Sequence, residues 1–305
     1  MRKLVEGCYL VDVFSDVYAV KGLVHPPGRI YAVPRIIEGV KVKSVREGFA
    51  FVAEKNPAYV FQDPYLGRPV IAVPETSVKQ PIYPSKAIKG PPRLVEAAIQ
   101  LSHILSDAGV EHGFTGSLLL GTADEKSDID IVIYGDEKHY RAVKKLRQQD
   151  ILKPVDAEAI QILSESRLDT PKALPTIETE RRKILTGKYA GFLYTMKIIP
   201  ETSWENRDDT AIIPEKPYET TVEIVDDSFS FYTPCRYGVR NIGGELEVVE
   251  VISFRSRFSE MGVRGDRLTV RGLLERVVKP GRLYHRLNVG LDADDFMEPV
   301  NRRPC

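Results

Sequence analysis

The sequence predicts an α+β protein in which a segment of mixed helices and strands lies between two β-rich ends. Residues 1–85 and 206–305 contain short runs of β-branched and aromatic residues separated by proline and glycine, which is typical of strands joined by turns. In residues 86–205, apolar residues recur at helical spacing between shorter strand-like runs. We therefore expect three regions with these bounds. The β-rich ends would suit small barrels, and residues 206–305 could pack against residues 1–85.

The first element expected in the central region is a helix. Leu94, Ala98, Leu101 and Leu105 recur at helical spacing, and Gly109 follows as a stop. Further along, the pattern predicts strands at residues 110–114 and 129–134 and a helix at residues 140–149.

Two more elements complete this region. Thr176 can cap a helix that carries Glu178 and Glu180 in its first turns and ends at Gly187. Residues 190–199 then form a strand with two faces. One face holds Phe192, Tyr194, Met196 and Ile198, and the other holds Leu193, Thr195, Lys197 and Ile199.

Composition excludes few classes of protein. The chain has 305 residues with 43 Lys plus Arg and 43 Asp plus Glu, so its net charge argues neither for nor against a nucleic-acid partner. No apolar run is long enough to span a bilayer, and the first residues lack the core of a signal peptide. The cysteines have no metal-ligand spacing. We expect a cytoplasmic protein without a membrane partner, and the many charged residues and prolines favour a thermophilic source.

A turn and a strand in the central region carry the chemistry. At Gly116-Ser117, the glycine lets a phosphate approach the backbone and the serine hydroxyl can hydrogen-bond it. Asp128 and Asp130 open the next strand, where alternate residues point to one side, so both carboxylates face the same way. A divalent cation commonly stabilises such neighbouring charges. Mg²⁺ or Mn²⁺ bridging these carboxylates and substrate phosphates would suit nucleotidyl transfer.

The same residues also have ordinary interpretations. Asp128 and Asp130 could lie on a solvent-exposed strand edge, Ser117 could cap a helix, and Lys197 could be a surface lysine. Gly116-Ser117 upstream of the two aspartates favours the functional interpretation.

The combination resembles the nucleotidyltransferase superfamily of the DNA polymerase β type. Its signature is a Gly-Ser turn followed by a strand with two alternating aspartates, and Gly116-Ser117 and Asp128-Ile129-Asp130-Ile131 match it. The resemblance covers residues 93–200, and the whole chain also resembles an archaeal group of predicted nucleotidyltransferases. The resemblance implies a polymerase β-like core in which Ser117 contacts a nucleoside triphosphate and both aspartates hold magnesium.

The sequence departs from that superfamily at the third carboxylate, which a neighbouring strand normally supplies. The best match to that strand is residues 195–199, and its acidic position is Thr195. The third acid could be Glu223 or Glu158, two carboxylates could suffice, or the domain could bind nucleotides without turning them over. Lys197 lies on the same strand face as Thr195 and could meet phosphate in each case.

Two functions are therefore open. One is a metal-dependent enzyme that moves a nucleotidyl group from a nucleoside triphosphate to an unknown acceptor, a nucleic-acid end among the candidates, with release of pyrophosphate. The other is a catalytically degenerate scaffold that binds nucleotides or RNA. Residues 231–290 hold eleven Lys or Arg against six Asp or Glu, with aromatic residues such as Phe254, Phe258 and Tyr284 interleaved. That surface could follow a nucleic-acid backbone, or its charges could be paired with each other.

Overall fold

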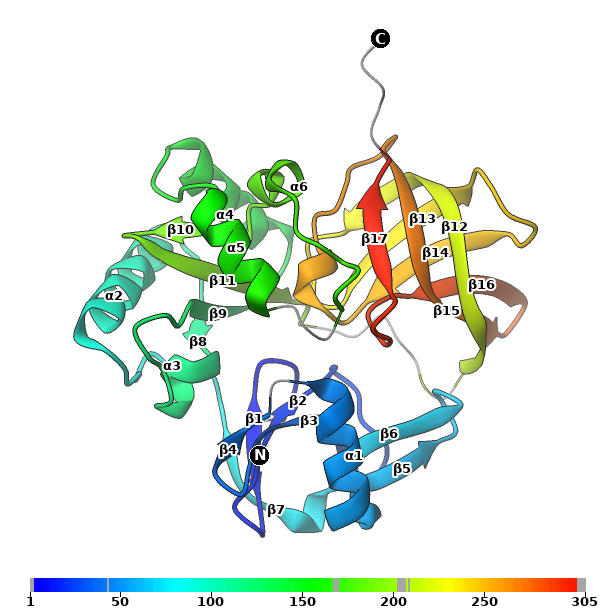
Figure 1. Cartoon of the computed structure of the whole chain (residues 1–305), viewed down its shortest axis with the longest axis horizontal. Coiled ribbons are helices and arrows are strands. Elements are labelled where there is room, and N and C mark those ends of the chain that lie inside the picture. Colours follow the sequence, from blue (N-terminus) through cyan, green and yellow to red (C-terminus); the bar gives the residue numbers. More distant parts are fainter. Residues whose placement is uncertain (1–2, 43, 167–169, 202–206, 208, 301–305) are drawn as a thin grey trace.

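The structure, a computed structural model, describes residues 3–42, 44–166, 170–201, 207 and 209–300. Within these residues the strands form three sheets of seven, four and six strands, and each sheet draws on one continuous stretch of chain (Figure 1). We name them the N-terminal, central and C-terminal sheets. The central and C-terminal sheets lie beside each other, and the N-terminal sheet lies below them in Figure 1. The expected α+β class, with β-rich regions flanking a mixed core, is confirmed.

The N-terminal sheet has the strand order β5-β6-β3-β2-β1-β7, with β4 paired to β3. One face packs against the helix α1 (Val45–Lys55), and its core includes Leu10, Tyr18, Val20 and Val52. The Ser44 side chain caps α1 by accepting a hydrogen bond from a first-turn amide. The strands are β1 (Tyr9–Asp12), β2 (Val17–Val20), β3 (Arg29–Ile37), β4 (Val40–Lys41), β5 (Val60–Asp63), β6 (Arg68–Pro74) and β7 (Val78–Ile82), and the short 3-10 helices are η1 (Pro57–Tyr59) and η2 (Glu75–Ser77).

The central sheet has the order β10-β11-β9-β8, in which β11 and β9 are parallel and the other pairs antiparallel. Its strands are β8 (Gly113–Phe114), β9 (Ile129–Tyr134), β10 (Thr186–Tyr189) and β11 (Phe192–Ile199). The helices of this region are α2 (Pro92–Asp107), α3 (Gly116–Leu120), α4 (Glu137–Gln148), α5 (Ala157–Ser166) and α6 (Ile177–Arg182). Apolar side chains from α2, α4, β9 and β11 form one shared core.

Long apolar patterns predicted these elements well, and short ones did not. All four apolar residues expected to face inward from the first helix are fully buried in α2, and β9 has the expected bounds. The strand expected at 110–114 is shorter, because only Gly113 and Phe114 pair with β9. The helix capped by Thr176 ends at Arg182 rather than at Gly187. Gly187 lies in β10, where a Cβ atom would stand 2.4 Å from the Lys153 carbonyl oxygen, so close packing explains this glycine.

The C-terminal sheet has the order β12-β13-β14-β16-β15-β17, and β15 also pairs with β12. The paired strands β12, β13, β14, β16 and β15 therefore form a closed ring, because β15 pairs with β12. The core inside includes Val222, Tyr237, Val251, Leu268 and Leu287. The strands are β12 (Ala211–Phe229), β13 (Cys235–Asn241), β14 (Val248–Ser253), β15 (Arg267–Lys279), β16 (Arg282–Asn288) and β17 (Phe296–Pro299), and η3 (Ser256–Phe258) is a 3-10 helix.

Two contacts join the N-terminal region to the start of the C-terminal sheet. The amide of Ile212 donates to the Tyr65 carbonyl oxygen at 3.0 Å. At Gly67, an added Cβ would stand 2.6 Å from the Pro214 ring, so the β5–β6 turn lies directly against the start of β12.

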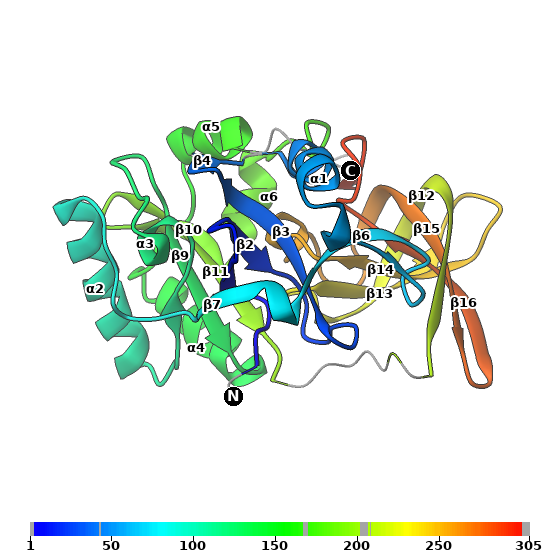
Figure 2. The ribbon, with the colours of Figure 1, turned by 90° about the horizontal axis from the view of Figure 1, so that it is seen from below.

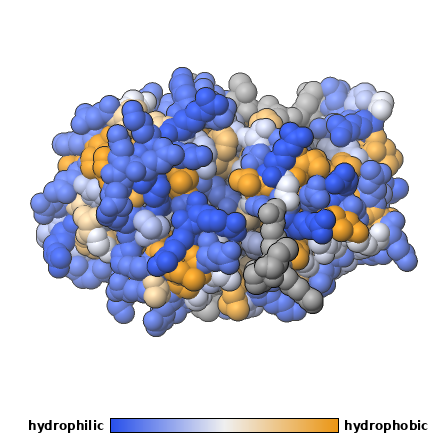
Figure 3. Space-filling view, turned by 90° about the horizontal axis from the view of Figure 1, so that it is seen from above, coloured by the Kyte–Doolittle hydropathy of each residue, from blue (hydrophilic) through white to orange (hydrophobic). Residues whose placement is uncertain are grey.

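Three further observations concern the surface, the helices and the cysteines. Figure 3 shows a mainly hydrophilic face with hydrophobic side chains in scattered patches. Of the helices in the described residues, none combines the length and apolar character needed to cross a membrane. Cys8 and Cys235 are buried, and their sulfur atoms make hydrogen-bond contacts with the Tyr134 hydroxyl and the Ser253 carbonyl oxygen, respectively.

One buried carboxylate joins the central region to the C-terminal sheet. Glu260 accepts hydrogen bonds from the amides of Ile184 and Leu185 at 2.9 and 3.0 Å and from the Tyr140 hydroxyl at 2.8 Å. Its own backbone has a φ of +58°, a strained value for a residue that is not glycine. Three donors in two different segments, α4 and the residues just before β10, therefore depend on a single side chain.

We expect Glu260→Ala to lower the free energy of unfolding by about 2–4 kcal/mol, because it leaves buried donors without an acceptor. Chemical denaturation would measure this change. Glu125→Ala, at an exposed position, is the control and should cost less than about 0.5 kcal/mol. Equal stability of the two variants would show that the carboxylate does not join the two regions.

Candidate functional site

The two aspartates lie at the start of β9 and point away from the core. Ile129, Ile131 and Ile133 of this strand are fully buried in the shared core. Because strand side chains alternate, Asp128 and Asp130 lie on the opposite face, next to each other. Burial of the three isoleucines fixes the position of the strand. Because the carboxylates alternate with these isoleucines, they lie on the face of the strand that points away from the core.

The electrostatics of this pair are unfavourable without a bound cation. Burial and the neighbouring Asp130 carboxylate raise the pKa of Asp128 to about 7. Burial also raises the pKa of Asp130, and the nearby Lys197 and Arg35 oppose this rise. Burial and a neighbouring like charge both disfavour the ionised form. The folded chain therefore holds two carboxyl groups in a place where a positive charge would stabilise them.

Gly116 brings the preceding turn into contact with Asp130. It has a φ of +65°, and a Cβ atom added to it would stand 2.1 Å from the Asp130 Oδ2 atom. Only glycine permits both the backbone conformation and this approach. The next residue, Ser117, has a buried Oγ atom that finds no hydrogen-bond partner among the described residues. A substrate oxygen at this point would give that hydroxyl a partner.

β11 supplies the neighbouring wall of the site. In the parallel pairing of β11 with β9, Thr195 stands opposite Asp130 and Lys197 stands opposite Val132. The Lys197 Nζ atom lies 3.4 Å from the Glu6 Oε1 atom, which also accepts from Lys21 at 2.9 Å. Although burial alone would raise the pKa of Glu6, the two lysines lower it below its usual value. The position that the superfamily fills with an acid thus holds a threonine, and an ion-paired lysine lies two residues along.

The N-terminal sheet contributes residues to the site that the sequence did not indicate. The Gly116 amide donates to the Tyr9 hydroxyl at 3.2 Å, and Thr115 Oγ1 donates to the Gly7 carbonyl oxygen at 2.9 Å. Figure 2 shows β2 and β3 overlying the strands of the central sheet. Tyr9, Lys21 and Arg35 therefore belong to the surroundings of the aspartates. They lie at least ninety residues away in the sequence, and no local pattern marks them.

Neither Glu223 nor Glu158 is placed with the aspartates. Glu223 lies in β12 of the C-terminal sheet and pairs with Arg240 at 2.9 Å and Arg267 at 3.9 Å. Glu158 lies in α5 and pairs with Lys188 at 3.0 Å. Both carboxylates serve as ion-pair partners in other parts of the chain.

The donor set fits a cation that a substrate helps to bind. No group of three or more His, Cys, Asp and Glu side chains in the described part of the chain is placed to hold a metal ion. Asp128 and Asp130 offer the oxygen ligands that Mg²⁺ and Mn²⁺ prefer, and Mg²⁺ is usually bound by one or two carboxylates plus substrate phosphates. The pair therefore suits a metal that arrives with a phosphorylated ligand.

The basic residues of the C-terminal sheet are largely paired. Arg236 and Arg286 contact Glu250, and Arg286 also bonds Glu275 at 2.7 Å. The other arginines with a carboxylate partner are Arg240, Arg267, Arg271 and Arg276. Phe258 is only 1% exposed and packs in the core. These contacts favour the salt-bridged interpretation of this region over a surface that stacks bases.

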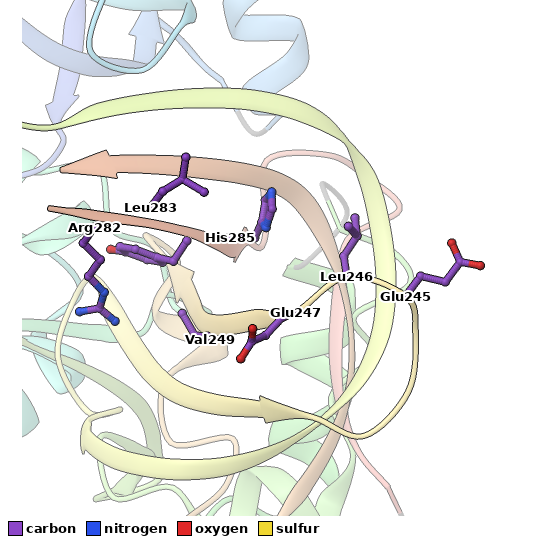
Figure 4. Close-up of a pocket in the computed structure, with 8 residues that line it drawn as sticks. Glu245, Leu246, Glu247, Val249, Arg282, Leu283 and His285 are labelled. Atoms are coloured by element: carbon purple, nitrogen blue, oxygen red, sulfur yellow. The ribbon is translucent and has the colours of Figure 1, made fainter. Parts of the chain in front are cut away.

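A cavity of about 470 Å³ lies in the C-terminal sheet (Figure 4). Residues from the β13–β14 loop, β14 and β16 line it, and the Arg282 guanidinium stacks over the Tyr284 ring at 4.7 Å from its centroid. None of the residues around Asp128 and Asp130 contributes to it, so it is separate from the candidate site. Its lining consists of Glu245, Leu246, Glu247, Val249, Arg282, Leu283, Tyr284 and His285.

Comparison with known proteins agrees with this geometry. Residues 98–229 match the nucleotidyltransferase domain family. The chain is also 28% identical over 284 residues to an uncharacterized protein of Methanocaldococcus jannaschii, with 86% of this chain and 82% of that protein covered. No solved structure matches the chain. The resemblance inferred from the sequence is thereby confirmed, and an archaeal homologue exists.

Gly116→Ala should be more destabilising than an alanine placed at another glycine with positive φ. Gly109→Ala is the matched control, because Gly109 has a φ of +73° and nothing within 4 Å of an added Cβ. Both variants share the conformational cost, of about 1 kcal/mol, and Gly116→Ala adds overpacking against Asp130 of about 1–3 kcal/mol. Unfolding free energies would measure the difference. Equal costs would contradict the close approach of the turn to the carboxylate.

Proposed function

We propose that the protein is a metal-dependent nucleotidyltransferase that uses a nucleoside triphosphate, because residues 98–229 match the nucleotidyltransferase domain family. The observation that carries this proposal is the partly buried pair Asp128 and Asp130 beside the Gly116-Ser117 turn. Two carboxyl groups with raised pKa values and a buried hydroxyl without a partner match a metal ion accompanied by phosphate.

Each residue has a role in this proposal. Asp128 and Asp130 would hold Mg²⁺ or Mn²⁺, and Ser117 Oγ would donate a hydrogen bond to a phosphate oxygen. Gly116 allows the turn to lie against Asp130, and Lys197 adds positive charge next to the pair. The bound metal would offset the negative charge of the triphosphate and of the departing pyrophosphate.

The reaction transfers one nucleotidyl group. An oxygen of the acceptor forms a bond to the α-phosphorus, and the bond from that phosphorus to the α–β bridging oxygen breaks. The bonding electron pair leaves with pyrophosphate, and the acceptor's proton passes to water. Positioning and charge stabilisation, rather than a protein-bound intermediate, would supply the rate enhancement.

Thr195 favours a second candidate function. It stands opposite Asp130 at the position where the superfamily provides an acid, and a threonine can neither act as a general base nor bridge two metal ions. In this alternative the domain binds a nucleotide and one cation as a scaffold and does not release pyrophosphate. The two candidates share the binding site and differ in turnover.

Triphosphate binding should depend on both the metal and the aspartates. We expect calorimetry to detect binding of at least one nucleoside triphosphate in the presence of Mg²⁺ or Mn²⁺, and no binding to Asp128→Asn/Asp130→Asn. Without metal this variant should be at least as stable as the natural protein, because the repulsion between the carboxylates is gone. Thermal unfolding in a chelator would check this, so that loss of binding is not mistaken for unfolding.

The matched control is Asp107→Asn/Glu111→Gln, which removes two charges from exposed positions of the same domain. It should bind as the natural protein does. If no triphosphate binds the natural protein, or if binding survives in Asp128→Asn/Asp130→Asn, the proposed function is wrong. If binding does depend on the aspartates, release of pyrophosphate on addition of candidate acceptors would distinguish the enzyme from the scaffold.

Restoring an acid on β11 should strengthen metal binding. Thr195→Asp would place a third carboxylate opposite Asp130, and we expect the affinity for Mn²⁺ to rise about tenfold, or about 1.4 kcal/mol. The neutral isostere Thr195→Asn is the control, and titration with Mn²⁺ followed by paramagnetic resonance is the measurement. Equal affinities in the two variants would mean that position 195 does not face the metal.

A further inference from the structure

The N-terminal sheet has two faces with different chemistry. Leu10 of β1 and Tyr18 and Val20 of β2 point into the core beneath α1. The alternate positions face the other way, so Tyr9 on β1 and Lys21 just after β2 share the opposite face. Pairing aligns Tyr9 with Ala19 and Ala19 with Val33, which extends this face across β3.

Arg35 lies on the same face, at an irregularity in the pairing of β2 with β3. Tyr18 pairs with Pro34 and Val17 with Ile36, so Arg35 has no cross-strand partner on β2. Such a bulge redirects a side chain relative to a regular strand. Arg35 is two residues beyond Val33, and its side chain is partly buried.

This face is fixed against the candidate site by several contacts. The hydroxyl of Tyr9 accepts from the Gly116 amide, and the Tyr134 hydroxyl donates to the Glu6 carbonyl oxygen at 3.1 Å. At Gly7, an added Cβ would stand 2.8 Å from a methyl of Val132 in β9. The N-terminal sheet therefore forms a wall of the same site and is packed directly on the strand that carries the aspartates.

The positive groups on this wall differ in whether they are already paired. Lys21 and Lys197 share the Glu6 carboxylate. Arg35 lies on the face that the Tyr9 hydroxyl joins to the Gly116 turn. Yet among the described residues no carboxylate lies within 4.0 Å of its guanidinium, and no acceptor takes a hydrogen bond from it. A partly buried guanidinium with five unused donors is a site for an anion.

We propose that Arg35 binds the polyphosphate of the triphosphate, so that the N-terminal sheet completes the nucleotide site of the central domain. The proposal rests on the proposed function. Arginine suits this role because its planar fork can form two parallel hydrogen bonds with a phosphate. The aspartates of the central sheet and Arg35 of the N-terminal sheet would then contact the same ligand.

If Arg35 binds phosphate, Arg35→Gln should change the affinities for the triphosphate and for Mn²⁺ differently. Arg35→Gln should weaken the binding of the metal–triphosphate complex about tenfold or more, because it removes a charged hydrogen-bond donor. The same substitution should leave the affinity for Mn²⁺ alone unchanged or higher, because a positive charge near Asp130 is gone. A purely structural role for Arg35 would weaken both. Calorimetry with a triphosphate, and paramagnetic resonance with Mn²⁺ alone, measure the two affinities.

Two further variants complete the experiment. Arg35→Lys should recover part of the triphosphate affinity, because it keeps the charge and loses the fork. Arg46→Gln removes an exposed arginine from the same region and should bind both ligands as the natural protein does.

The outcomes separate this proposal from the proposed function. If Arg35→Gln binds the triphosphate normally while Asp128→Asn/Asp130→Asn does not, the assignment of Arg35 is wrong and the proposed function stands. Parallel loss of Mn²⁺ and triphosphate binding in Arg35→Gln also overturns the assignment. If the natural protein binds no triphosphate, both proposals fall together.

Discussion

Repulsion between the Asp128 and Asp130 carboxylates is the constraint around which the rest of the molecule is arranged. Burial of Ile129, Ile131 and Ile133 fixes the strand that holds them together. Apolar burial of this kind contributes of the order of 1.5–3 kcal/mol for each large side chain, which is enough to hold an unfavourable charge pair in place. Gly116 on one side and Lys197 and Arg35 on the other then surround the pair with groups that suit a phosphorylated ligand.

The composition of the candidate site also depends on the position of the N-terminal sheet. Its first strand does not merely precede the domain in the chain but packs against β9 and against the Gly116 turn. The Gly116 amide donates to the Tyr9 hydroxyl, so under the proposed function a phosphate would meet Ser117 Oγ and the side chains of the opposite wall rather than that amide. The C-terminal region contributes stability rather than site residues. Glu260 binds segments of the central region, and most arginines of the C-terminal sheet form ion pairs.

The sequence predicted those features that depend on residues close together in the chain. Alternation placed the aspartates on one face of β9, and helical spacing identified the buried side of α2. It failed where one residue type serves two purposes: Gly187 looked like a helix stop and is instead a glycine required by close packing in β10. It also could not find Tyr9, Lys21 or Arg35, because their position depends on how two separate sheets pack. The alignment of Thr195 with Asp130 is a matter of strand register, and it was expected from the resemblance to the superfamily rather than from a local pattern.

The residues that match the family do not coincide with the limits of the sheets. The matched residues begin inside α2 and end with β12. β12 is hydrogen-bonded on both sides, to β13 and to β15. Cut out at these limits, the segment would carry a shortened α2 and a 19-residue strand with both edges unpaired, and such edges promote aggregation. The matched segment is therefore smaller than the hydrogen-bonded sheet to which its last strand belongs, and transplanting it into another protein would separate β12 from its partners.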